Sequence, residues 1–155
     1  LLWKAVCAAV ARNLAAIDEL KALLSSADEP LILDPLLRGL GGTEQFEEAD
    51  RIIADLGKRH SLAPWMLERL RAETRLEARA PPILGDAVDR LAVLTSDESL
   101  PLVHRAEIWH NLGTGHDRLG QREAAMASFE KAAALNPFLD AAREELDRLR
   151  AMGAP

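Results

Sequence analysis

Residues 107–137, EIWHNLGTGHDRLGQREAAMASFEKAAALNP, hold the most informative spacing in this sequence of 155 residues. Trp109 and Leu112 fall on one face of a predicted first helix, because residues three or four apart on a helix are neighbours. Gly113 has no side chain, so a second helix is expected to approach the backbone closely there. That second helix is predicted from about Gln121 to Leu135, and its packing stripe alternates small and large residues.

Glycine and proline mark the ends of these two predicted helices. Gly120 is expected to end the first helix, because a glycine just past a helix end adopts the left-handed conformation at little cost. Pro137 cannot continue the second helix but can start another, with Asn136 as its N-cap. A last helix is therefore predicted over 138–152, with apolar residues on one side and a charged outer side that keeps the end of the chain soluble.

The spacing of this stretch resembles the tetratricopeptide repeat, a helix–turn–helix unit of about 34 residues. The residues that carry the resemblance are Trp109, Leu112, Gly113, Gly120, Ala125, Phe129, Ala132 and Pro137. His116 departs from the pattern, which usually has a tyrosine at that position. The resemblance covers about one repeat, over residues 106–137.

The rest of the chain also shows helical spacing, interrupted by Gly and Pro. The predicted segments are one long helix over 1–25, a short helix or turns over 31–40, a helix over 43–59 with Thr43 as N-cap, a helix over 64–80 that Pro81-Pro82 stops, and a helix over 85–94. The pairs 62–80 with 84–95 and 102–118 with 121–135 are predicted to be consecutive hairpins.

These segments together predict an all-α fold, a short right-handed α-solenoid of tetratricopeptide-like hairpins with a C-terminal capping helix. We expect one helical-repeat domain over 1–155. Its predicted parts are an N-terminal helix and helical insert (1–42), degenerate hairpins (43–101), the clear repeat (102–137) and the capping helix (138–152).

The sequence also predicts the environment of three residues in the clear repeat. Trp109 is expected to be largely buried between the second helix, near Ala125 and Phe129, and the preceding hairpin. Gly113 is expected at a close approach of two helices. His116 is expected to be half-buried and to hydrogen-bond a carbonyl.

Composition limits the partners. The net charge of −6 argues against nucleic acid, because binding to phosphates requires a basic surface. No apolar stretch reaches the roughly 18–20 residues that span a bilayer, so no membrane partner is expected.

Cys7 is the single cysteine, which suits a reducing, cytoplasmic compartment. The chain begins with Leu1 rather than Met, so we expect a piece or processed form of a longer protein, and we interpret residues 1–11 as an ordinary helix rather than a signal peptide.

No catalytic or cofactor-binding pattern is present. His104, His110 and His116 are six residues apart, so they point to different faces of a helix, and no metal site is predicted. Gly41-Gly42 lacks the Lys-Ser/Thr of a phosphate loop and is interpreted as a plain turn. Cys7 has no histidine positioned near it in the sequence and is interpreted as a small packing residue. We therefore expect a protein that is not an enzyme and has no cofactor.

One stripe of positive charge leaves two interpretations open. Arg71, Arg75 and Arg79 step by four along the predicted 64–80 helix. The stripe is either a solvated face on which Glu68 pairs with Arg71, or a site that binds an anion or a carboxylate.

The resemblance implies a binding function in a concave groove lined by the first helices of successive hairpins. On this chain the implied partner-binding groove consists of Glu107, His110, Asn111, Thr114, Asp117 and Arg118. The predicted function is a non-catalytic protein–protein interaction module that takes a peptide or a partner helix. The alternative is a regulatory or dimerisation appendage of a larger enzyme or transcription regulator, with residues 1–25 as the connecting or self-associating element. The oligomeric state is left open.

Overall fold

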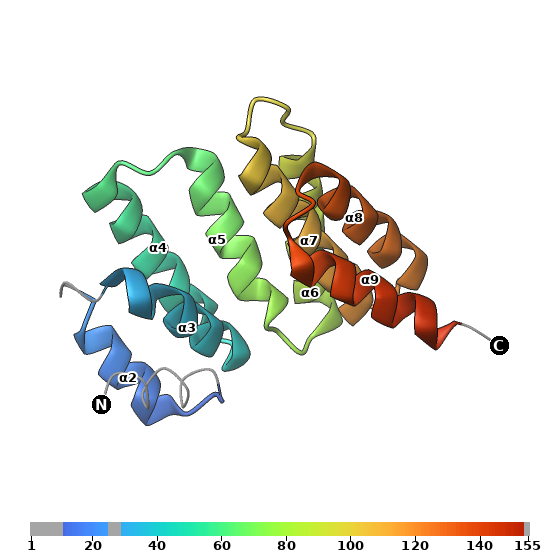
Figure 1. The fold of residues 1–155 in the computed structure, drawn as a ribbon. Helices are drawn as coiled ribbons and strands as arrows, with labels where there is room; N and C mark the ends of the chain where they lie inside the picture. Colours follow the sequence, from blue (N-terminus) through green and yellow to red (C-terminus); the bar gives the residue numbers. More distant parts are fainter. Residues whose placement is uncertain (1–10, 25–28, 154–155) are drawn as a thin grey trace. The chain divides into compact units, whose positions relative to one another are not determined.

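The computed structural model describes residues 11–24 and 29–153, and this part of the chain is all-α (Figure 1). Its helices are α2 (Leu14–Ala22), α3 (Glu29–Gly42), α4 (Phe46–His60), α5 (Pro64–Leu76), α6 (Pro81–Thr95), α7 (Leu102–Arg118), α8 (Arg122–Leu135) and α9 (Asp140–Met152), and no strand occurs among the described residues. The chain divides into two compact units, Leu1–Ile83 and Leu84–Pro155, which we call unit 1 and unit 2.

Unit 1 is built around α3, which packs against α2, α4 and α5, while α4 also packs against α5 (Figure 1). Its core is aliphatic and consists of fully buried side chains from three helices: Ile17, Leu20, Ile32, Leu36, Leu40 and Ile53. Gly41 lies so close to α5 that a Cβ at this position would collide with the backbone carbonyl of Thr74. Glycine thus allows the close approach of α3 and α5.

The predicted insert over 31–40 is a complete helix of 14 residues that runs through Pro35. A proline inside a helix removes one backbone N–H donor and disfavours the preceding turn. The helix nevertheless forms because Ile32, Leu36 and Leu40 all project from one face and are completely buried. Tertiary packing of this apolar face outweighs the local effect of the proline.

Thr43 does not begin α4 but ends α3, contrary to the prediction. Its hydroxyl donates to the backbone carbonyls of Gly39 (2.9 Å) and Leu40 (3.2 Å). The helix α4 begins at Phe46, and Gln45 before it makes no side-chain capping bond. The prediction failed because a threonine hydroxyl can accept from backbone N–H groups at the start of a helix or donate to backbone carbonyls at its end.

The prediction of one helix over 1–25 is wrong in the described part. The helix α2 begins at Leu14, where the Asn13 side chain accepts a hydrogen bond from the Ala16 amide (3.3 Å). Arg12, immediately before it, has a φ of 66°, which interrupts a right-handed helix. Residues 1–10 and 25 lie outside the described residues.

Two other helix ends differ from the prediction. The helix α5 ends at Leu76 rather than near Ala80. Pro81-Pro82 was expected to stop that helix, but the two prolines instead begin α6. The first residues of a helix need no intrahelical partner for their N–H groups, so prolines fit there.

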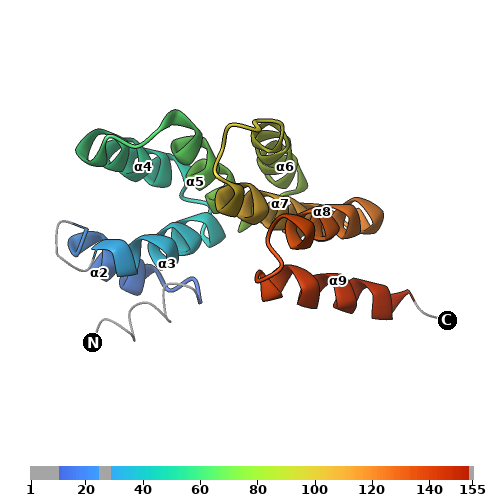
Figure 2. The same ribbon diagram turned by 45° about the horizontal axis from the view of Figure 1, so that its top comes forward.

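Unit 2 contains the helix pair α7 and α8, with α7 packed along α8 and α8 against α9 in both views (Figures 1 and 2). The bounds of α7 agree with the predicted 102–118, and α8 lies within the predicted 121–135. The last helix starts at Asp140 rather than at 138, and Asn136 is not its N-cap. The Asn136 side chain instead accepts from the Phe138 amide (3.0 Å) in a turn that leaves Phe138 90% exposed.

Gly113 lies at a close approach of α7 to α8, as expected. A Cβ at this position would lie 2.7 Å from two carbons of the Phe129 ring, which itself is buried. Ala125 and Ala132, one turn to either side of Phe129, are also completely buried. Gly120 has a φ of 73° and ends α7, and the Gln121 amide donates back to the His116 carbonyl (2.9 Å).

The close approach at Gly113 predicts opposite effects of the same substitution at two helical glycines of unit 2. Gly113→Ala should destabilise the protein by about 1–2 kcal/mol, because overpacking against Phe129 exceeds the gain in helix propensity. Gly85→Ala in α6 is the matched control, because a Cβ there meets nothing within 4 Å. The control substitution should stabilise the protein by about 0.5–1 kcal/mol.

Urea denaturation followed by far-UV circular dichroism measures both changes. An unchanged or higher midpoint for Gly113→Ala would contradict the described packing of α7 on α8.

Candidate functional site

The predicted groove residues share one side of α7. At about 100° per residue, they cover about one third of the helix circumference. The residues of this groove face are Glu107, His110, Asn111, Thr114, Asp117 and Arg118, and each is at least partly exposed. Ile108, Leu112 and Gly115 on the other side of the helix are buried. The alternation of core and surface along α7 thus leaves this polar face accessible.

Contacts at the start of the groove face tie it to the core of the hairpin. The His110 ring lies 5.5 Å from the Phe129 ring, centroid to centroid, and its Nδ1 is 3.4 Å from the Asn111 side-chain oxygen. The Thr114 hydroxyl donates to the His110 carbonyl (3.2 Å). His110 thus helps to cover Phe129, while Asn111 and Thr114 present amide and hydroxyl groups beside it.

The far end of the groove face is joined to the capping helix α9. Arg148 Nη2 lies 2.5 Å from Asp117 Oδ2, and Arg148 Nε lies 2.7 Å from Glu145 Oε2. These hydrogen bonds, to Glu145 and then to Asp117, raise the pKa of the Arg148 guanidinium above its usual value. The negative charge of Asp117 is therefore balanced within unit 2. Sequence reasoning missed Arg148, which belongs to a helix interpreted only as a solvated cap.

Glu107 also has a basic neighbour. Its carboxylate lies 3.5 Å from His104 Nδ1, one turn earlier on α7. This pair is an ion pair only when the imidazole is protonated.

Arg122 of α8 also contacts the C-terminal part of α9. It begins α8, where a cation is unfavourable with respect to the helix dipole. Its guanidinium reaches instead to the C-terminal end of α9, where Nη2 donates to the Leu149 carbonyl. A Cβ at Gly153 would collide with this guanidinium, so a glycine there makes room for it. The placement of α9 therefore depends on a residue of α8.

The arginine stripe is engaged with carboxylates in unit 1. Arg75 Nη1 and Nη2 lie 3.1 and 2.7 Å from the two carboxylate oxygens of Asp50. Arg71 Nη1 lies 2.6 Å from Glu68 Oε1. Arg79 lies beyond the end of α5, so the helical stripe stops at Arg75. These pairs agree with the salt-bridged interpretation, while binding of an external anion stays a prediction.

Trp109 is partly buried, and part of its side chain reaches the surface of unit 2. The Lys131 ammonium lies 5.2 Å from the centroid of its ring. The indole lines a surface pocket of about 550 Å³ together with residues of α8. The exposed small residues Ala127 and Ala134 of α8 line this pocket as well.

His116 and the predicted absences of a metal site and of a membrane span concern the remaining parts of the chain. His116 is half-exposed, and its Nδ1 lies 2.6 Å from the Gln121 side-chain oxygen, so its carbonyl partner belongs to a side chain. Within 11–24 and 29–153, no three His, Cys, Asp or Glu residues come together as a metal site would require. Across the same ranges no helix is both long and apolar enough to cross a bilayer. Cys7 lies outside the described residues.

Comparison with known proteins supports the interpretation of the helix pair. Residues 106–139 match the family model of the tetratricopeptide repeat, so α7 and α8 form one such repeat. The matched segment is about a fifth of the chain. The comparisons with curated proteins and with solved structures found no match.

The hydrogen bond from Arg122 to α9 generates a prediction about local stability. Arg122→Ala should lower the free energy of local opening of α9 by about 1.5–3 kcal/mol, because a charged hydrogen bond to a partly buried carbonyl is lost. Amide hydrogen exchange over residues 140–152 measures this change. Arg143→Ala removes the same charge from a surface pair with Asp140 on α9 and should change exchange little.

Equal protection of α9 in wild type and Arg122→Ala would show that the capping helix does not depend on this contact.

Proposed function

We propose that this chain is a non-catalytic protein–protein interaction module and that the groove face of α7 binds an extended peptide or a partner helix. Tetratricopeptide repeats are generally a non-catalytic interaction fold, and residues 106–139 match that family. The observation that carries the proposal is the continuous polar arc on α7, partly exposed throughout, opposite a buried side that holds the hairpin together.

The chemistry of this arc favours a partner held by hydrogen bonds at its centre. The Asn111 amide has both donors and an acceptor, as the backbone of an extended peptide has, and the Thr114 hydroxyl lies one turn further on. Because Arg148 balances Asp117, the groove face is less repulsive to a negatively charged partner than its sequence suggests. Arg118 adds an exposed positive charge at the same end.

The capping helix extends this surface. Arg148 reaches from α9 to the groove side of α7, so a bound peptide that follows α7 would also meet α9. We infer that the binding surface includes residues of both α7 and α9. We assign the module to the cytoplasm as a scaffold, since a chain with one cysteine suits a reducing compartment.

Selection of peptides from a random display library on the full chain tests the proposal. Synthetic versions of the selected peptides are then titrated against wild type, a groove variant and a control. The groove variant is Asn111→Ala with Thr114→Ala, which spares His110 and its contact with Phe129. The control is Arg143→Ala, an exposed residue on the outer side of α9.

Binding to the groove variant should weaken by at least about tenfold, equivalent to about 1.4 kcal/mol. Binding to Arg143→Ala should not change, and both variants should unfold at the same urea concentration as wild type. If the folded groove variant retained the wild-type affinity for every selected peptide, the groove face would not be the binding surface.

A further inference from the structure

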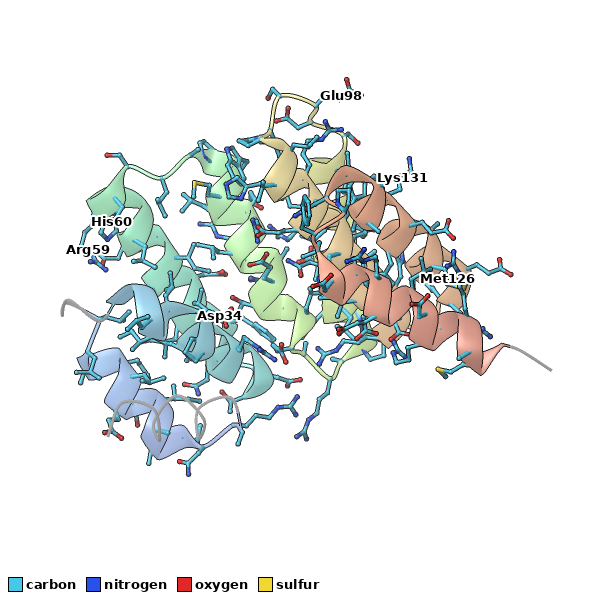
Figure 3. All side chains as sticks on the ribbon, in the orientation of Figure 1. Asp34, Arg59, His60, Glu98, Met126 and Lys131 are labelled. Carbon is cyan, nitrogen blue, oxygen red and sulfur yellow. The ribbon has the colours of Figure 1, made fainter. Side chains whose placement is uncertain are left out.

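A second depression lies on the flank of α7 that is turned away from the groove face. At about 100° per residue, Arg105 and Trp109 project about 140–180° from the centre of the groove face. The pocket has a volume of about 550 Å³ and belongs entirely to unit 2. Figure 3 shows two of its lining residues, Glu98 on the loop before α7 and Lys131 on α8, at the same edge of unit 2.

Two cations and an indole dominate the chemistry of this pocket. The exposed Lys131 ammonium lies 5.2 Å from the centroid of the half-buried Trp109 ring. The Arg105 guanidinium lines the pocket from α7, and its Nε is buried without a hydrogen-bond partner among the described residues. A buried donor without an acceptor is unfavourable, so the site gains from an acceptor brought close to this guanidinium.

Two carboxylates, Glu98 and Glu130, also line the pocket, and Asp97 lies next to Glu98 in the chain. Glu130 is bridged by Arg150 of α9, with Oε1 and Nη2 3.0 Å apart. Asp97 accepts from the Ser99 hydroxyl (2.6 Å) and amide (2.9 Å), which hold the pKa of its carboxyl below the usual value, and Arg105 adds a smaller effect. Glu98 stays at the rim as an exposed acid.

The floor of the pocket beside the indole is apolar. Ala127, Ala134 and Leu135 of α8 line it together with Trp109. A volume of several hundred Å³ accommodates one or two side chains of a peptide. The pocket therefore combines attraction for a carboxylate with an aromatic and aliphatic surface directly next to it.

From this combination we propose that the pocket of Arg105, Trp109 and Lys131 is a second peptide-binding site, specific for an acidic segment of a partner protein. An Asp or Glu carboxylate of the partner pairs with Arg105 and Lys131, and the adjacent apolar side chain covers the exposed edge of Trp109. The unpartnered Nε of Arg105 and the exposed ammonium of Lys131 favour this occupant, and the site is independent of the groove face.

Tryptophan fluorescence follows occupancy of this pocket directly. A full-length variant with Trp3→Phe and Trp65→Phe keeps Trp109 as its single tryptophan. The probe is an acetylated and amidated pentapeptide, Glu-Leu-Glu-Phe-Glu, and the control peptide is its glutamine isostere, Gln-Leu-Gln-Phe-Gln. If the variant does not fold, calorimetric titration of the wild-type chain replaces the fluorescence measurement.

The acidic peptide should change Trp109 fluorescence saturably, and the isostere should bind at least about tenfold more weakly, because charged hydrogen bonds are stronger than neutral ones. Lys131→Gln changes an exposed residue and should therefore disturb the structure little. This variant and Arg105→Gln should each bind the acidic peptide more weakly than wild type by a similar factor. Lys58→Gln in unit 1 removes the same charge elsewhere and should have no effect.

Three results would overturn the proposal: no saturable response at millimolar peptide, equal affinity for the isostere, or unchanged affinity in both folded pocket variants. Loss of acidic-peptide binding in the Asn111→Ala, Thr114→Ala variant would place the peptide in the groove and also overturn it. The groove proposal is judged on the display-selected peptides, so either proposal can fail without the other.

Discussion

The ring of Phe129 occupies the space that a side chain at position 113 would need. This one contact sets the separation of α7 and α8, since a Cβ on Gly113 would lie 2.7 Å from the ring. It also fixes how α7 is rotated about its axis. Because Gly113 must face Phe129, the arc centred on Asn111 and Thr114 stays partly exposed, while Arg105 and Trp109 line the separate pocket beside α8. Both candidate binding surfaces therefore depend on the same packing.

The same phenylalanine connects the repeat to the capping helix. Phe129 shares a buried cluster with Leu146 and Leu149 of α9, so the α7 and α9 contacts meet on one residue of α8. Arg122 and Arg148 then fix the C-terminal part of α9, through the Leu149 carbonyl and through Asp117. Apolar burial holds α9 against α8, and these directional bonds determine how it lies along the groove face.

The helix pair α7–α8 was predictable because its determinants are local. Gly113, Gly120 and Phe129 lie within one short stretch, and their spacing alone specifies two helices and the point at which they touch. Helix ends elsewhere were less predictable, because the same residue type serves opposite roles. Thr43 ends α3 instead of starting α4, and Pro81 starts α6 instead of ending α5. Which role such a residue takes depends on the burial of the flanking apolar faces.

The surfaces were predictable only in part. The arc of groove residues follows from helical periodicity, and the structure places all of them on one side of α7. The pairing of Asp117 with Arg148 joins residues 31 positions apart, and no local pattern indicates it. The pocket that Trp109 shares with Ala127 and Ala134 of α8 likewise joins residues about 20 positions apart, and no local pattern indicates it.

A double-mutant cycle on Gly113 and Phe129 tests most directly whether their contact determines the hairpin. Gly113→Ala, Phe129→Leu and the double variant are unfolded with urea, and the three changes in unfolding free energy are compared. A smaller side chain at 129 leaves room for the new Cβ at 113. The double variant should therefore be more stable than the sum of the single changes by about 0.5–3 kcal/mol. Strict additivity would mean that the two residues do not meet, and it would contradict the orientation of α7 on which both binding surfaces rest.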